Sequence, residues 1–359
     1  MIFLVVVLHS GLIYENNGFS SLIWIVFDPA TNTLATELRM ILDIFIMATI
    51  FFISGYLTPL SMKNKDAWTF VKTKFSRLII PWIVAVLTLV PLYKFIFLYS
   101  RNLPQQDWTT YFHWTNQVWS QNWLWFLPVL FLFDILFLLF SKLNIKWPEP
   151  SLKQAIGVVF LIGLAYSICM DIFNLQGWTK TILLDFQNER LLIYFLMFLL
   201  GALSFRLKIF ASKPKSLKLY MLVLGTVWLP YILYRYFYIN FLMKPGANIF
   251  NEFTDTLLLW LSFHLSLLGL LYVLITTFRR YFDKQNKLSQ VLNRNSYRVY
   301  IIHTVVMGAL AMVLLNIGMP SILKFAVLTI ITFVVCNLII YCYSQSYKTI
   351  KNSTFQKKA

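Results

Sequence analysis

The sequence predicts an all-α protein, a polytopic membrane bundle of about ten transmembrane helices of which the first is short. Hydrophobic residues make up 59% of the 359 positions and charged residues only 13%, a balance that soluble domains of this size do not show. The apolar residues gather in long runs, and the basic residues gather between alternate runs. Because lipid offers no hydrogen-bond partner to free backbone amides, such runs must be helical.

Ten apolar segments follow one another along the chain. Most approach the ~20 residues that a helix needs to cross a ~30 Å hydrocarbon core. The first is the exception, since ~14 residues at a rise of 1.5 Å per residue span only ~21 Å. We expect one membrane-embedded domain over 1–345 and a basic tail over 346–359. The ten segments are 1–14, 38–58, 78–99, 121–140, 154–171, 190–205, 219–241, 254–278, 299–316 and 322–345.

The distribution of Lys and Arg predicts the orientation of the bundle. Loops 59–77, 141–153, 206–218 and 279–298, together with the tail, hold 23 of the 31 basic residues. The positive-inside rule therefore places these loops and the C-terminus in the cytoplasm. The net charge of +17 then reflects topology, helped by anionic lipid of the inner leaflet. The acidic residues favour the outer side: Glu15, Asp28, Glu37, Asp107, Asp171, Asp185, Glu189, Glu252 and Asp255.

The same pattern argues against two other kinds of site. The basic residues are divided among five short segments with no soluble domain to organise them, so we expect no nucleic-acid partner. Cys169, Cys336 and Cys342 lie in apolar segments without a close pair. This placement indicates core packing rather than a disulfide or a metal site.

Four short motifs occur in order along the chain. His9 follows a VVVL run near the end of the first segment. FFISGYL then begins at Phe51, followed by a lysine-rich loop and by RLIIP from Arg77 to Pro81. WFL begins at Trp125, and the pattern S-x-x-x-Y-x-x-H ends at His303. Together they resemble the acyltransferase-3 family, membrane-embedded enzymes that acylate extracytoplasmic glycans.

His9 is the first candidate for chemistry. A histidine inside a membrane helix is costly unless it faces the bundle interior, so it is a functional candidate by default. The alternative is a histidine at the outer helix end that is hydrogen-bonded to the following loop. The resemblance implies that His9 is the catalytic residue, and as a general base it would take the proton of an attacking hydroxyl.

A second group of candidates surrounds the start of the ninth apolar segment. Tyr300 and His303 are three residues apart and share a helix face. We expect both within two turns of the cytoplasmic end, at the depth of Arg77, Arg294 and Arg298. Together they could form a cationic rim for the phosphates of an acyl-CoA, because Arg makes bidentate contacts with phosphate. The alternative is membrane anchoring by snorkelling side chains, which is favoured for Arg294.

Tryptophans crowd the predicted outer loop before the fourth segment. Trp119, Trp123 and Trp125 lie near Trp108, Trp114, His113 and Asn122. Tryptophan at a membrane surface ordinarily forms an interfacial belt. Aromatic faces also stack on sugar rings, so an outer glycan platform that includes Trp119, Trp123 and Trp125 is the functional alternative.

Three charged residues lie inside apolar segments: Asp43, Asp134 and Arg235. Each costs ~2.5–3.5 kcal/mol on insertion scales if it faces lipid, so we expect structural pairing. Arg39 and Asp43 are four apart and can pair within one helix. Asp134 has no local partner, and we expect it to meet Arg235 or His264.

The resemblance implies a bacterial inner-membrane acyltransferase. Such an enzyme takes an acyl group, acetyl or succinyl, from cytoplasmic acyl-CoA and transfers it to a hydroxyl of an extracytoplasmic glycan, without a metal. The main alternative is a secondary transporter or lipid-carrier flippase, which would be built as symmetric halves with Gly- or Pro-broken helices. A catalytically silent scaffold is a third alternative.

The start of the chain departs from the family pattern. Family members carry an Arg about eleven residues before the first histidine, and only eight residues precede His9. We therefore expect the encoded chain to begin at least ~10 residues earlier, with a basic residue on the cytoplasmic side. A start at Met1 would instead favour a degenerate, inactive member.

Overall fold

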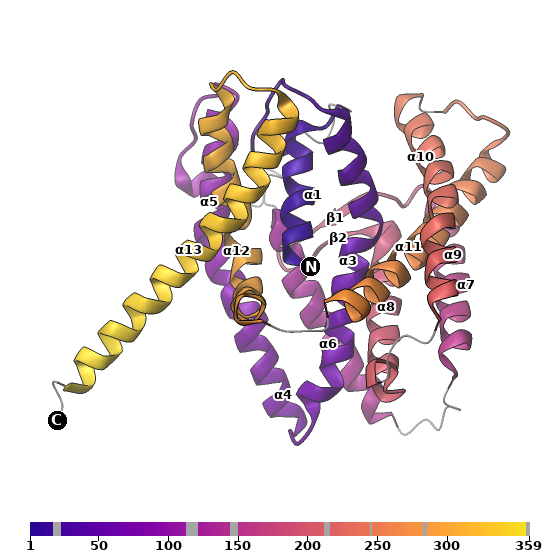
Figure 1. Cartoon of the computed structure of the whole chain (residues 1–359), viewed down its shortest axis with the longest axis horizontal. Coiled ribbons are helices and arrows are strands. Elements are labelled where there is room, and N and C mark those ends of the chain that lie inside the picture. The colour runs from indigo at the N-terminus through magenta and orange to yellow at the C-terminus, as the bar shows by residue number, and fades with distance from the viewer. Residues whose placement is uncertain are drawn as a thin grey trace. The chain divides into compact units, whose positions relative to one another are not determined.

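The computed structural model describes residues 1–16, 23–112, 121–143, 150–211, 216–244, 246–282 and 286–356, and these are almost entirely helical (Figure 1). Nine of the described helical stretches are long and apolar enough to cross a membrane, and α1 adds a shorter apolar helix. The chain is therefore a multi-pass, all-α membrane protein, as predicted. Its helices are α1 (Ile2–Tyr14), α3 (Thr33–Met62), α4 (Ala67–Lys74), α5 (Ile80–Tyr99), α6 (Phe126–Lys142), α7 (Leu152–Ile172), α8 (Asn188–Arg206), α9 (Leu217–Thr226), α10 (Trp228–Met243), α11 (Glu252–Tyr281), α12 (Lys287–Leu315) and α13 (Ser321–Gln356).

The shorter elements lie between these helices. A π-helical turn, Phe75–Ile79, joins α4 to α5. Turns of 3₁₀ helix cover Trp108–Phe112, Asn122–Trp125 and Ile209–Ala211. The strands β1 (Trp178–Lys180) and β2 (Asp185–Gln187) form an antiparallel hairpin in which Trp178 pairs with Gln187.

The connection after α3 is shorter than the predicted loop 59–77. Only residues 63–66 separate α3 from α4, so Lys72, Lys74 and Arg77 lie on helical backbone. Asp66 caps α4 by accepting the backbone N–H of Thr69 at 3.1 Å. Hydrogen bonds from the Thr69 side chain and backbone hold the pKa of Asp66 below its usual value. The capped turn lets a lysine-rich stretch continue as helix into the apolar α5.

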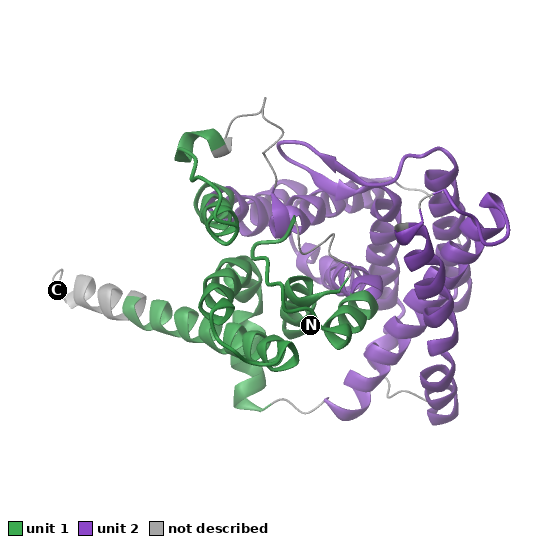
Figure 2. Ribbon diagram, turned by 90° about the horizontal axis from the view of Figure 1, so that it is seen from above, with its two compact units in different colours: residues 1–42, 85–113, 285–359 green, residues 43–84, 114–284 purple. Residues whose placement is uncertain are grey.

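The helices divide into two compact units, and the division falls within α3 and α5 (Figure 2). Unit 1 comprises Met1–Leu42, Ala85–His113 and Gln285–Ala359. Unit 2 comprises Asp43–Val84 and Trp114–Lys284. Each unit has its own buried residues and its own buried ion pairs.

In unit 1, α1 packs against both α12 and α13, which run side by side (Figures 1 and 2). Glycines lie where α1 meets α3 and where α12 meets the segment before α3. A Cβ added to Gly11 would lie 2.9 Å from the Arg39 Cβ, and one added to Gly308 would lie 2.4 Å from Ile25 Cδ1. Small residues of this kind let membrane helices and their neighbours approach closely. The apolar α1 is thereby held inside the unit.

In unit 2, the FFISGYL motif packs the second half of α3 against α8. A Cβ added to Gly55 would lie 1.9 Å from the Phe198 carbonyl oxygen, and one added to Gly201 would lie 2.0 Å from that of Phe52. The two glycines therefore allow the backbones to cross in direct contact. Phe51, fully buried, lies beside this crossing and packs on a cluster of rings that comprises Trp125, Phe126, Phe133 and Tyr194. The motif has a packing role in this fold.

Candidate functional site

The structure brings His9 of α1 and His303 of α12 into direct hydrogen-bond contact inside unit 1. The Nδ1 atom of His9 lies 2.7 Å from Nε2 of His303, and the ring planes differ by only 6°. Stacked rings stay about 3.5 Å apart or more, so this contact joins the ring edges. An in-plane, edge-to-edge contact is the geometry of an N–H···N hydrogen bond between two imidazoles.

The backbone fixes which nitrogen of each ring carries the proton. Nδ1 of His303 lies 2.7 Å from the carbonyl oxygen of Tyr300. A carbonyl only accepts, so His303 Nδ1 is the donor and its Nε2 must accept. His9 therefore donates from Nδ1, which leaves the lone pair on His9 Nε2 free to take a proton. The proton positions are assigned from this network of contacts.

Aromatic and hydroxyl groups surround the histidine pair. The Trp24 ring lies 4.8 Å from that of His9, and Tyr93 meets Trp24 edge to face at 6.0 Å. The Thr304 hydroxyl is 3.2 Å from His303 Nε2. His303 and Thr304 are fully buried, whereas His9 is partly exposed. The pair is thus shielded on the His303 side and accessible on the His9 side.

Trp24 is held by its backbone and presents an unused donor. Arg101 donates to its carbonyl oxygen at 2.9 Å, and the Tyr93 hydroxyl donates to the carbonyl of Ile23 at 3.3 Å. The Trp24 Nε1 atom is buried and has no hydrogen-bond acceptor among the described residues. Buried donors are normally paired, so this indole N–H beside His9 points to a ligand or reaction atom.

Two buried ion pairs hold the segments around the histidines. Arg39 Nε lies 2.9 Å from Glu15 Oε2, and Lys324 Nζ lies 3.1 Å from Asp28 Oδ2. All four side chains are less than a tenth exposed. Pairing is needed because an isolated charge inside the protein is strongly unfavourable. Lys324 was not among the predicted site residues, because its only signal in the sequence is that it lies near the outer end of the last apolar segment.

The placement of His303 near the cytoplasmic rim stays a prediction, but the helix that carries this residue begins earlier than expected. Helix α12 begins at Lys287 and not near 299, so His303 lies in the fifth turn of the helix and not within its first two turns. The first turns of α12 are polar, so the apolar pattern of the sequence did not reveal where the helix begins. Tyr300 is also buried, and its carbonyl positions His303. Both residues therefore belong to the histidine site.

The predicted cationic residues remain at exposed positions in separate units. Arg298 on α12 is exposed and donates to the Ser344 hydroxyl at 3.2 Å. Arg294 precedes it by one turn and is also exposed. Arg77 is exposed in the π-helical turn of unit 2, and π-helical turns occur frequently at functional sites.

The structure does not support a stacking platform on Trp123 and Trp125. Their side chains are only 3% and 9% exposed. Trp125 is covered by Phe51, Trp178 and Tyr194, with ring centroids 5.6–6.2 Å apart. No open face is left for a sugar ring, because the turn Asn122–Trp125 folds inward onto the core of unit 2. Trp119, with Trp114 and His113, lies outside the described residues.

The charged residues inside the spans find partners other than the predicted ones. Arg39 meets Glu15 at 2.9 Å, and Asp43 meets Arg190 at 2.9 Å. These partners come from distant segments, which a count of residues along one helix cannot find.

Asp134 pairs with Lys74 of α4 rather than with the expected Arg235 or His264. Its Oδ1 lies 2.9 Å from Lys74 Nζ and accepts the Thr58 hydroxyl at 2.8 Å. Asp134 is fully buried in unit 2. Lys74 reaches it because the predicted loop is helical at this point.

Comparison with known proteins identifies the family. A family model described as an acyltransferase domain, that of the acyltransferase-3 family, matches residues 1–341. Neither the curated proteins nor the solved structures include a significant match to this chain. The match spans α1 and α12, so it includes the His9–His303 pair. The chain belongs to the acyltransferase-3 family and is a multi-pass membrane acyltransferase.

Proposed function

We propose that the protein transfers an acyl group, acetyl or succinyl, from cytoplasmic acyl-CoA to a hydroxyl of an extracytoplasmic glycan, with His9 as the general base. The observation that carries this proposal is the 2.7 Å hydrogen bond from His9 Nδ1 to His303 Nε2. It orients the His9 ring and leaves Nε2 as the basic atom. Family membership favours this enzyme over the alternative of a secondary transporter or flippase.

The proton transfers follow from the tautomers. His9 Nε2 takes the proton of the attacking hydroxyl as its oxygen bonds to the thioester carbonyl carbon. The imidazolium that forms is stabilised through Nδ1–H by His303 Nε2, whose own Nδ1–H is held by the Tyr300 carbonyl. When the C–S bond breaks, His9 returns the proton to the leaving thiolate. The products are the acyl ester and free CoA, and His9 is neutral again.

Trp24 supplies the group that the developing oxyanion requires. A donor aimed at the carbonyl oxygen stabilises the charge of the tetrahedral intermediate. The buried Nε1–H of Trp24 lacks an acceptor among the described residues, and its ring packs on His9. These two observations support Trp24 as the oxyanion donor.

Exposed arginines support the binding of acyl-CoA. Arg298 and Arg294 lie one turn apart on α12, and Arg77 lies in the π-helical turn. One guanidinium group can donate two parallel hydrogen bonds to the oxygens of a phosphate. We propose Arg77 and Arg298 as phosphate contacts, whereas Tyr300 and His303 act in the histidine site. The positive-inside distribution supports a bacterial inner-membrane location with a cytoplasmic C-terminus.

Mass spectrometry of cell-envelope glycans tests the proposal. A bacterial strain that lacks the gene should lose an acyl modification, and expression of the wild-type chain should restore it. His9→Ala should fail to restore it at equal membrane abundance. His264→Ala, which alters a buried histidine of unit 2, should restore it. Identical glycans in the deletion and wild-type strains would overturn the proposed acceptor.

A further inference from the structure

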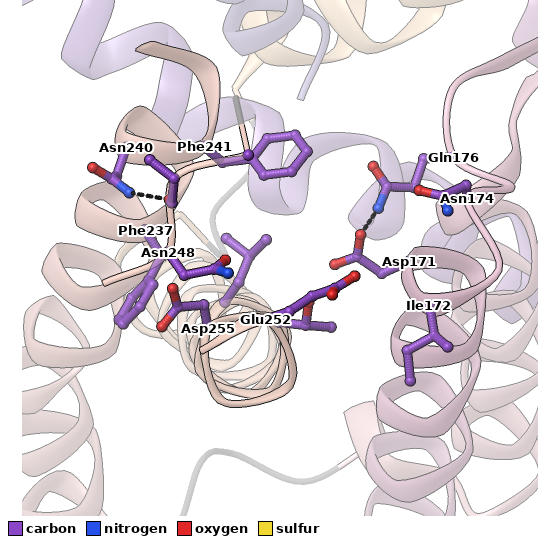
Figure 3. Close-up of a pocket in the computed structure, with 14 residues that line it drawn as sticks. Asp171, Ile172, Asn174, Gln176, Phe237, Asn240, Phe241, Asn248, Glu252 and Asp255 are labelled. Atoms are coloured by element: carbon purple, nitrogen blue, oxygen red, sulfur yellow. Dashed lines mark hydrogen bonds between the residues drawn. The ribbon is translucent and has the colours of Figure 1, made fainter. Parts of the chain in front are cut away.

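A cavity of about 360 Å³ lies in unit 2 where α7 ends and α11 begins (Figure 3). Asp171 lies at the end of α7, Asn240 and Phe241 near the end of α10, Asn248 in the next connection, and Glu252 at the start of α11. Figure 3 shows these side chains around one common space. The volume is within the roughly 300–1,000 Å³ typical of small-molecule sites.

The lining combines an apolar part with carboxamides. Phe237 and Leu259 are only 5% and 8% exposed and supply the buried apolar wall. Four carboxamide side chains also line the cavity, and each carries both donors and acceptors: those of Asn174, Gln176, Asn240 and Asn248. Gln176 donates to Asp171, and Asn240 donates to the Ala247 carbonyl oxygen at 3.4 Å (Figure 3). The cavity therefore suits a ligand that has both apolar faces and several hydroxyl groups.

The charge of the cavity is opposite to that of the chain. Three carboxylates line it, from Asp171, Glu252 and Asp255, and the described residues of its lining include no Lys, Arg or His. The whole chain has 31 basic and only 14 acidic residues. Phosphate groups are repelled by such a lining, so neither acyl-CoA nor an anionic lipid headgroup fits.

The carboxylates are also unsuited to a metal ion. Asp255 accepts the backbone N–H groups of Ile249 at 2.6 Å and Phe250 at 3.2 Å. Asp171 accepts the indole N–H of Trp260 at 3.0 Å on one carboxylate oxygen and the side-chain amide of Gln176 on the other. Across the part of the chain that the structure describes, no three His, Cys, Asp or Glu side chains converge as metal ligands. The carboxylates thus act as separate hydrogen-bond acceptors.

We propose that this cavity binds a neutral sugar unit and is a binding subsite for the acceptor glycan, an inference that rests on the proposed function. Sugar hydroxyls donate to carboxylates and accept from carboxamide N–H groups. The C–H faces of a sugar ring pack on apolar side chains such as Phe237 and Phe241, which line the cavity. Glu252 repels an acidic sugar and so selects a neutral one.

Saturation-transfer NMR on the full chain in lipid nanodiscs tests this subsite. Sugar-based detergents are avoided because their headgroups would compete. The probes are methyl glucoside and methyl glucuronide, which differ in one carboxylate. Methyl glucoside should bind at least tenfold more tightly than methyl glucuronide. Equal binding of both probes, or binding of neither, would overturn the inference.

Two variants locate the binding site, each with a matched control. Asn248→Ala should weaken methyl glucoside binding at least tenfold, whereas Asn316→Ala, outside the cavity, should not. Glu252→Gln should reduce the discrimination against methyl glucuronide, whereas Glu37→Gln should keep it. Unchanged binding in Asn248→Ala together with unchanged discrimination in Glu252→Gln would place the sugar elsewhere.

The binding readout separates this inference from the proposed function. Binding does not depend on transfer, so His9→Ala should still bind methyl glucoside. If the cavity binds the sugar but the deletion strain keeps all its glycan acylation, the proposed function fails and the subsite stands. If glycan acylation depends on the gene but no saturation transfer occurs, the subsite fails alone.

Discussion

Two buried histidines, one in each unit, share a backbone arrangement but differ in their partners. His303 of α12 donates from Nδ1 to the Tyr300 carbonyl at 2.7 Å, and the Nδ1 of His264 in α11 lies 2.8 Å from the Trp260 carbonyl. Both are at most 2% exposed. Nε2 of His303 meets His9, whereas Nε2 of His264 is unpaired among the described residues and abuts Gly163.

The difference shows what makes a buried histidine useful for chemistry. Burial and a carbonyl partner fix the tautomer in both units, so neither feature distinguishes a reactive site. In unit 1, the Nε2 of His303 accepts a hydrogen bond from a second imidazole, that of His9, and His9 is partly exposed. The Nε2 of His264 has no such partner among the described residues. His264 is therefore a natural control for the histidine pair.

The largest expected effect comes from His9→Ala. Loss of a general base typically reduces the rate by roughly 10²–10⁴-fold, so kcat for acyl transfer should fall by that factor. His264→Ala should retain most of the wild-type kcat per folded molecule. Transfer of radiolabelled acetyl groups by purified protein in nanodiscs measures both. If kcat falls equally in the two variants, the histidine pair of unit 1 is no more important for catalysis than His264 of unit 2.

Trp24→Phe should have the next largest effect. The substitution keeps the ring against His9 and removes only the Nε1–H donor, and loss of one oxyanion donor costs roughly 10²–10³-fold in kcat. Because the donor acts in the transition state, kcat and kcat/KM should fall together. Trp68→Phe, at an exposed tryptophan of α4, is the control. A wild-type kcat in Trp24→Phe would show that Trp24 does not donate to the oxyanion.

Unit 2 should respond in stability more than in rate. Lys74→Met leaves the carboxylate of Asp134 buried without its cation, which costs roughly 3–5 kcal/mol. We expect a lower Tm in nanodiscs for Lys74→Met and recovery in the Lys74→Met/Asp134→Leu double variant. An unchanged Tm in the single variant would show that the 2.9 Å ion pair contributes little to stability.

The smallest expected effect is on acyl-CoA binding. Arg77 is exposed, and an exposed ion pair contributes at most about 1 kcal/mol, so Arg77→Ala should weaken acyl-CoA binding by less than roughly tenfold. The dependence of binding on salt should also decrease. Lys180→Ala, in β1, should change neither quantity. If Arg77→Ala binds acyl-CoA with wild-type affinity and salt dependence, Arg77 is a membrane anchor and not a phosphate contact.

Much of the fold could be predicted from the sequence because lipid constrains it strongly. Apolar runs and alternate basic loops are sufficient to find the long helices. Helix limits were less predictable where polar residues continue a helix. Lysines after Met62 indicated a loop, yet the Asp66 cap starts α4 there. Asn286 likewise caps α12, so this helix begins at Lys287, well before the apolar run that starts at 299.

The site could be predicted in part. His9 was identifiable because a histidine inside an apolar helix requires a partner. Its partner comes from 294 positions later in the chain, and no local pattern encodes that pairing. Trp24 had no sequence signal, since its importance depends on an unpaired buried atom. Trp123 and Trp125 had a strong signal, but the turn that carries them folds inward.

A double-mutant cycle on His9 and His303 tests the central claim most directly. His303→Leu removes the acceptor for His9 Nδ1–H, and His303→Gln restores one through its amide oxygen. If the two histidines act as a unit, His9→Ala and the His9→Ala/His303→Leu double variant should have equal kcat. His303→Gln should then recover much of the rate that His303→Leu loses. Losses that multiply in the double variant, with no recovery by Gln, would contradict the account.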